Sequence, residues 1–197
     1  MKNKRLKNIL LTGLVSLIGG CSFGDLKPSS IDTGMEFRHV EGKYSVFKDK
    51  KIFYLGNVQV NYPLNEKNDF YLKVKGGSGT LDLSPNVIDG EVSGNALGGE
   101  CGISYHLNES TTLDIGLELL KAEIELEGRM NKTRVKLNDE IVEWGMNLGV
   151  GKVIPLSKHV KLKVSGGYNF TDNESKRGNY DFDGSFFGIQ VRGEIPK

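Results

Sequence analysis

Apolar and polar residues alternate one by one over most of this sequence. In one clear stretch, apolar side chains take every second position, with glutamate, glycine and asparagine between them: Val142, Trp144, Met146, Leu148 and Val150. Alternation with a period of two gives a β-strand one apolar face and one polar face. Because the pattern recurs about eight times, in runs of about ten residues, the sequence predicts an all-β fold.

The apolar positions of the predicted strands fall in the ranges 31–37, 54–62, 70–74, 97–107, 113–119, 142–150, 160–170 and 187–195. Three short polar segments each end one run and lead into the next; they are 62–66, 105–109 and 154–158. Their regular spacing is typical of an up-and-down sheet built from similar hairpins.

Longer polar and glycine-rich segments separate these hairpins, over 39–51, 76–90, 127–140 and 171–183. We predict that these segments are long loops. Short turns at one end and long loops at the other are the layout of transmembrane β-barrels. The sequence therefore predicts a closed antiparallel up-and-down transmembrane β-barrel of about eight strands, with both termini at the short-turn end.

The alternation alone is compatible with two kinds of barrel. A soluble lipocalin-like barrel turns its apolar face inward around a ligand, whereas a membrane barrel turns that face toward lipid. Glycine favours the membrane barrel, because it gathers on the polar face, where it makes room for long charged side chains inside a narrow lumen. Aromatic residues toward the ends of the apolar runs also fit the girdles of a membrane barrel.

Charges on the polar face nearly cancel, as a secluded lumen requires. The predicted lumen charge network consists of Arg38, Lys73, Lys75, Lys161, Lys163 and Arg192 together with Glu36, Glu100, Asp114, Glu118, Glu143 and Glu194. Because eight strands leave an interior that side chains just fill, we expect this network to plug the barrel.

The N-terminal segment is predicted to be a targeting signal and not part of the fold. A basic start is followed by an apolar stretch over 9–18, two glycines and Cys21. The sequence Ile18-Gly19-Gly20-Cys21 resembles the lipobox of bacterial lipoproteins, in which the cysteine becomes the lipidated N-terminus. The resemblance implies a signal peptide over 1–20, a lipidated linker over 21–30 and a barrel domain over 31–197.

Ser22 follows Cys21 at the place where, by resemblance to the lipoproteins of enteric bacteria, an aspartate favours retention in the inner membrane. The resemblance therefore implies an outer-membrane location, with the lipid on the periplasmic side. An ordinary secretory signal with a chance cysteine is the alternative.

Charge, hydropathy and cysteine count argue against several classes of protein. The net charge of +1 gives no electrostatic case for binding nucleic acid. No apolar segment after Cys21 is long enough for a transmembrane helix, so any membrane spanning must use strands. If Cys21 is acylated, Cys101 has no partner within the chain, which excludes a disulfide framework.

The repeated turn followed by an alternating strand resembles the small outer-membrane barrels of the OmpA/OmpX type. An example is Leu107-Asn108-Glu109-Ser110-Thr111-Thr112-Leu113-Asp114-Ile115-Gly116. The resemblance extends from residue 30 to residue 196 and lies in the pattern, not in a diagnostic motif. This chain differs in its lipoprotein signal and in its last residues, Ile195-Pro196-Lys197, where such barrels often end in an aromatic residue.

No catalytic, cofactor or metal site is predicted. His39, His106 and His159 lie far apart, each near a strand end or a turn, which is not a metal-ligand spacing. The glycines at 76–79 lack the lysine and hydroxyl residue of a phosphate loop and are predicted to form a flexible loop tip. Some eight-stranded barrels are lipid A deacylases, but no serine lies between His39 and Glu41, so we expect no enzyme activity.

The sequence thus predicts a structural or surface-interaction protein. Its exposed loops, with charged residues at 48–51 and 172–177, would contact lipopolysaccharide, a host surface or another membrane protein. Outer-membrane lipid surrounds the barrel, which is expected to be a monomer. Two alternatives are a narrow pore for small solutes and a lipid-anchored soluble lipocalin-like barrel that binds an apolar ligand.

Overall fold

The computed structural model describes residues 27–40, 51–82, 89–130, 133–175 and 184–196. The strands are β1 (Ser30–Val40), β2 (Lys51–Pro63), β3 (Asn68–Asp82), β4 (Asp89–Asn108), β5 (Thr111–Met130), β6 (Thr133–Pro155), β7 (Val160–Ser175) and β8 (Gly184–Glu194). Within the described ranges, no helix is long and apolar enough to cross a membrane. Cys21 and the loop charges at 48–50 and 176–177 lie outside these ranges.

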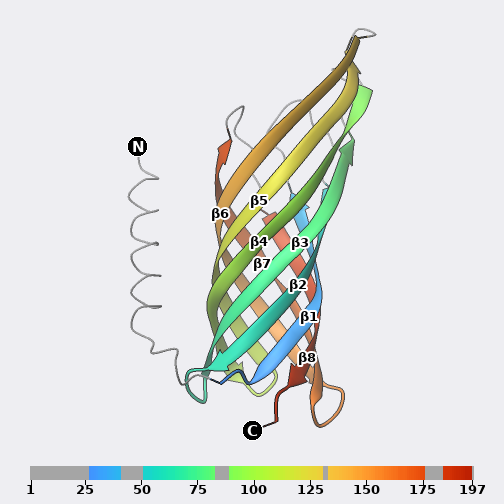
Figure 1. Cartoon of the computed structure of the whole chain (residues 1–197). Coiled ribbons are helices and arrows are strands. Elements are labelled where there is room, and N and C mark those ends of the chain that lie inside the picture. The colour runs from blue at the N-terminus through green and yellow to red at the C-terminus, as the bar shows by residue number, and fades with distance from the viewer. Residues whose placement is uncertain (1–26, 41–50, 83–88, 131–132, 176–183, 197) are drawn as a thin grey trace.

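Each strand pairs antiparallel with the next, and β1 pairs with β8 to close the barrel (Figure 1). The predicted all-β up-and-down barrel of eight strands is confirmed. Short turns follow β2, β4 and β6, as predicted. At the same end, the backbone of Ser29 bonds to Asn61 and Ile195, so the start of β1 lies beside the end of β8.

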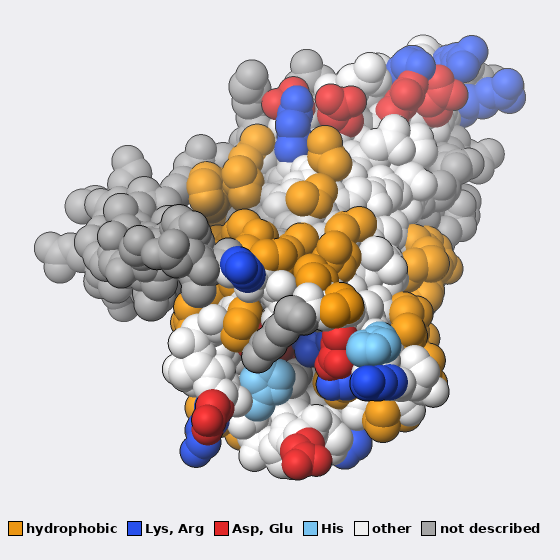
Figure 2. Space-filling view, turned by 60° about the horizontal axis from the view of Figure 1, so that its bottom comes forward, with side chains coloured by type: hydrophobic (Ala, Val, Ile, Leu, Met, Phe, Trp, Pro, Cys, Tyr) orange, Lys and Arg blue, Asp and Glu red, His pale blue; other side chains and the backbone are white. Residues whose placement is uncertain are grey.

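Apolar side chains cover the outside of the barrel, and polar side chains fill it. On β6, Leu148 is 41% exposed and Val150 is 52% exposed, whereas Glu143 and Asn147, which take alternate positions on the opposite face of the strand, are buried. On the face that Figure 2 shows, hydrophobic side chains gather between charged groups at the two ends of the molecule. This orientation is the reverse of the one that the lipocalin-like alternative requires.

The height of the apolar band matches a bilayer. On β4, the outward apolar positions run from Leu97 to Leu107. At about 3.3 Å per residue and a tilt of about 40°, this run spans about 25 Å, the height of the lipid-facing band of transmembrane barrels. Exposed aromatic side chains near the edges of the band include Tyr54, Tyr105, Trp144, Tyr168 and Phe170.

Three of the four predicted loops are too long, because parts of them belong to strands. The strands are accordingly longer than the predicted ten residues. Residues 76–82 continue β3, residues 127–130 and 133–140 belong to β5 and β6, and residues 171–175 continue β7. The glycines at 76–79 therefore lie within a strand and not at a loop tip. Strands of 20, 20 and 23 residues (β4, β5 and β6) extend beyond the rest of the barrel, at the upper right of Figure 1.

The polarity of the two faces reverses where these strands leave the apolar band. On the outward face of β5, Leu117 and Leu119 are followed by Lys121 and Glu123, whereas on the inward face Glu118 is followed by buried Leu120. A sheet in lipid needs apolar residues outside, but a sheet in water needs polar ones there. We call 121–130 of β5 and 133–140 of β6 the β5–β6 extension.

Candidate functional site

The centre of the lumen is an ionic cluster around Arg38 of β1. Its guanidinium donates to both oxygens of Glu118 on β5, at 2.7 and 2.8 Å, and to Glu36 on its own strand at 2.9 Å. Glu143 on β6 lies 3.6 Å from the same guanidinium. All four side chains are buried, so one arginine joins three carboxylates contributed by three strands.

Lys75 of β3 joins this cluster to a second group of charges. Its ammonium contacts Glu118 and lies 3.1 Å from Glu36 and 2.5 Å from Glu100 of β4. Glu100 also accepts a hydrogen bond of 2.6 Å from the Tyr71 hydroxyl and lies 3.2 Å from Lys73. Because a buried charge without partners is costly, these shared contacts are what make the filled lumen stable.

Two further ion pairs lie between the central cluster and the short-turn end. The Arg192 guanidinium of β8 donates twice to Asp32 of β1, at 2.8 Å each. The Lys163 ammonium of β7 lies 2.7 Å from Asp114 of β5, which also accepts from the Ser104 hydroxyl. The described ionic contacts thus involve every strand except β2.

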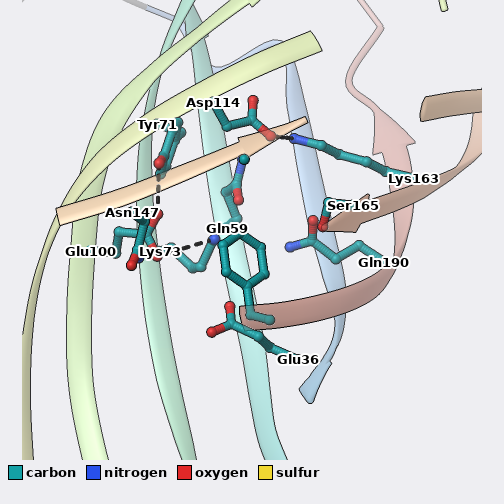
Figure 3. A pocket seen from close by; sticks show the side chains of 12 residues that line it. Glu36, Gln59, Tyr71, Lys73, Glu100, Asp114, Asn147, Lys163, Ser165 and Gln190 are labelled. Atoms are coloured by element: carbon teal, nitrogen blue, oxygen red, sulfur yellow. Dashed lines mark hydrogen bonds and ion pairs between the residues drawn. The ribbon is translucent and has the colours of Figure 1, made fainter. Parts of the chain in front are cut away.

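A small cavity lies beside these pairs. Figure 3 shows Asp114 and Lys163 pointing toward each other on one side of it, and Tyr71 and Lys73 pointing toward Glu100 on the other. Its volume is about 20 Å³, which is room for about one or two waters.

An apolar layer lies above the ionic cluster, on the side away from the short turns. Leu55 of β2, Ala96 of β4 and Leu120 of β5 pack together and are at most 7% exposed. Ile141 of β6 is fully buried. The lumen therefore contains a charged layer and, beyond it, an apolar layer.

Inward glycines make room for the large lumen side chains. A Cβ atom added at Gly116 would lie 2.3 Å from the Tyr71 hydroxyl, and one at Gly102 would lie 2.6 Å from it. At both positions a side chain would therefore collide with Tyr71. Tyr71 can reach Glu100 only because the next two strands of the sheet, β4 and β5, carry glycine there.

The structure places the predicted network residues inside the barrel, except at its short-turn rim. There, Lys161 and Glu194 contact each other with their side chains about one third exposed. Asp32 and Tyr71 are buried members of the network that the predicted set of charges omits. Asp32 lies two positions before Gly34, so extending the β1 alternation by one step would have found it.

Buried amides complete the polar interior. Gln190 of β8 donates to Asn57 of β2 at 2.8 Å, and Asn147 of β6 donates to Glu118 at 3.2 Å. Nearer the short turns, Gln59 donates to Asn61 at 2.7 Å. The alternation places these amides on the polar face, although the predicted charge network does not include them.

The β5–β6 extension carries ion pairs on its outward, exposed face. Lys121 lies 3.3 Å from Glu140, and Lys136 lies 3.0 Å from Glu127 and contacts Glu125. The hydrogen bond with Lys136 lowers the pKa of Glu127, and the hydrogen bond with Glu125 raises the pKa of Lys136. Both groups are therefore ionised at neutral pH.

The described residues contain no group of three or more histidine, cysteine, aspartate or glutamate side chains that could hold a metal ion. His106 pairs with Asp69 at 2.9 Å near the short turns. On the short-turn side of the apolar layer, paired charges and amides fill the described part of the lumen.

No protein-family model matches this sequence, and no curated protein matches it. Solved structures do match. Ail, the attachment invasion locus protein of Yersinia pestis, solved with the heparin analogue sucrose octasulfate, is 13% identical, with a TM-score of 0.51 over 85% of this chain and 97% of Ail. Neisserial surface protein A is 10% identical, with a TM-score of 0.50 over 84% of this chain and 96% of that protein.

The fold is that of small eight-stranded outer-membrane barrels. CarO of Acinetobacter baumannii, at 10% identity, gives the same result, with a TM-score of 0.50 over 86% of this chain and 98% of CarO. The predicted resemblance to this class of barrels is therefore confirmed at the level of fold.

Proposed function

We propose that this chain is an outer-membrane lipoprotein whose sealed barrel holds the β5–β6 extension outside the cell for contact with other surfaces. The main observation behind this proposal is that the barrel has an exposed apolar band on its outside and a buried ionic network on its inside. Apolar side chains exposed around a whole barrel are stable in lipid and not in water. The shared fold with outer-membrane barrels supports the same location.

The packing of the lumen supports a seal. The central charges contact each other directly, as in the 2.7 Å bond from Arg38 to Glu118, and the adjacent cavity measures about 20 Å³. An ion crossing the barrel would have to separate these pairs and then pass the apolar layer of Leu55 and Leu120. Apolar constrictions oppose ion passage by excluding water. These features favour a sealed barrel over a narrow pore.

The termini support the proposed orientation. Ser29 is bonded to the short-turn end of the barrel, and in outer-membrane barrels short turns face the periplasm. Cys21 precedes Ser29 by eight residues, which can span up to about 28 Å when extended. An acylated Cys21 would therefore reach the periplasmic leaflet, and the β5–β6 extension would face the outside.

The role that fits this arrangement is structural and adhesive rather than enzymatic. The extension presents its charges on a paired β-sheet, which holds them at set spacings along the ladder. Lipopolysaccharide, a host surface or another membrane protein would meet this extension first. The chain would act as a monomer, since its sheet is closed and needs no second copy to complete it.

Planar-bilayer recordings of the purified full chain test the seal. We expect no steady single-channel current, and a steady open current would overturn the sealed lumen. Removal of residues 1–21 tests the membrane barrel separately, because the remaining chain should still require detergent. A water-soluble monomer would contradict the proposal.

A further inference from the structure

The outward face of the β5–β6 extension has its charges sorted by height. Nearest the apolar band are three carboxylates and one cation: Lys121, Glu123, Glu125 and Glu140. Nearest the tip are three cations and one carboxylate: Glu127, Arg129, Arg134 and Lys136. The described outward face is therefore anionic at its base and cationic at its tip.

Two arginines face each other at this tip. Arg129 of β5 is the register partner of Arg134 of β6, and both are exposed. Like charges directly opposite each other on a sheet are destabilising. The pairing therefore does not serve the stability of the hairpin, but it places two guanidinium groups where one anion can meet both.

Among the described side chains, Glu127 is the carboxylate that pairs with Arg134 at this tip. The Arg134 side chain is 75% exposed and lies 3.4 Å from Glu127, which also contacts Lys136. None of the ion pairs that the structure describes in the extension involves Arg129; Asp89 of β4 is its register partner on the other side. The exposed guanidinium groups have donors in a planar fork that matches the oxygens of sulfate and phosphate.

The distance of the tip from the membrane indicates where such an anion would come from. From Lys121 to Arg129 the strand extends by about 25 Å along its own axis. The anionic base of the extension lies between the tip and the membrane. An anionic polymer approaching from outside would therefore meet the cations first, whereas the phosphates at the membrane surface would face the carboxylates.

We propose that the tip formed by Arg129, Arg134 and Lys136 binds a saccharide that carries several sulfate or phosphate groups. The inference rests on the proposed function, because only an outward-facing extension can meet such a polymer. Several anionic groups on one chain would engage the two arginines and the lysine together, and the affinity would fall with rising salt.

Dextran sulfate and uncharged dextran are the probes for this site. The full chain in detergent should bind dextran sulfate saturably at 0.1 M salt and should not bind dextran. The Arg129→Gln/Arg134→Gln variant should bind at least about tenfold more weakly, with a shallower salt dependence. The control variant Lys121→Gln/Lys158→Gln removes the same amount of charge from the base and from a short turn, and it should bind as the parent does.

Equal weakening in both double variants, or no saturable binding of dextran sulfate by the parent, would overturn the inference. Vesicles that contain lipopolysaccharide form a second arm: loss of binding there in the tip variant would assign the anions to a membrane source. If the tip does not bind, the barrel should still require detergent and should still conduct no ions. This outcome is therefore distinguishable from failure of the proposed function.

Discussion

Replacing Arg38 by methionine is expected to lower the free energy of unfolding by about 3–5 kcal/mol, the largest effect that we predict for a single charge. The arginine contacts Glu36, Glu118 and Glu143, and all three are buried. Without it, Glu36 and Glu118 would have to share Lys75 as their partner in the described ion pairs. The cost arises because buried carboxylates are left without enough positive charge.

Equilibrium unfolding in urea, with the barrel in lipid vesicles, measures this loss. Lys161→Met is the matched control, because it removes a cation whose pair with Glu194 is about one third exposed. Such a pair contributes about 0–1 kcal/mol. Equal losses in the two variants would contradict the ionic cluster as a source of stability, as would an Arg38→Met protein as stable as the parent.

Replacing Gly34 by alanine is expected to lower the free energy of unfolding by about 3 kcal/mol or more. Gly34 lies on β1 at the seam that closes the barrel, opposite Gln190 of β8. An added Cβ would lie 2.0 Å from the backbone oxygen of Ile189 and 2.6 Å from the Cα of Gln190. Because backbone atoms cannot rotate away, β1 and β8 would have to separate there.

Gly193→Ala is the control at the same seam, since the nearest atom to its added Cβ is the Ile31 oxygen at 3.8 Å. We expect this variant to refold into vesicles with the yield and stability of the parent. Both variants are compared by the yield of folded protein and by urea unfolding. If Gly34→Ala equals Gly193→Ala in folded yield and in urea unfolding, then β1 and β8 pack less closely at this seam than the structure shows.

The sequence was sufficient to predict the strands and their faces, because alternation is a local signal. A one-residue shift would move every side chain to the other face. Lys163, with Val164 beside it, could therefore be placed in the lumen without knowledge of any partner. Which charges meet depends instead on strand register, and the pair of Arg38 and Glu118 joins residues 80 positions apart.

The loop predictions failed for a physical reason that the sequence does display. Residues 121–127 alternate charged and apolar side chains, so the strand continues, but the charges now take the outward positions. An apolar face was expected to stay on one side throughout. That holds only inside the bilayer, since a sheet that leaves lipid for water must reverse its polarity.

The outward orientation of the apolar face is the central claim, and Trp144 tests it directly because it is the single tryptophan of the chain. Its side chain lies on the outside of β6 and is 41% exposed, two outward positions from Glu140 at the edge of the band. In vesicles whose acyl chains carry bromine, its fluorescence should be strongly quenched, more by bromine near the headgroups than by bromine near the chain ends. Unchanged fluorescence in brominated lipid, together with full quenching by aqueous iodide, would contradict a lipid-facing apolar surface.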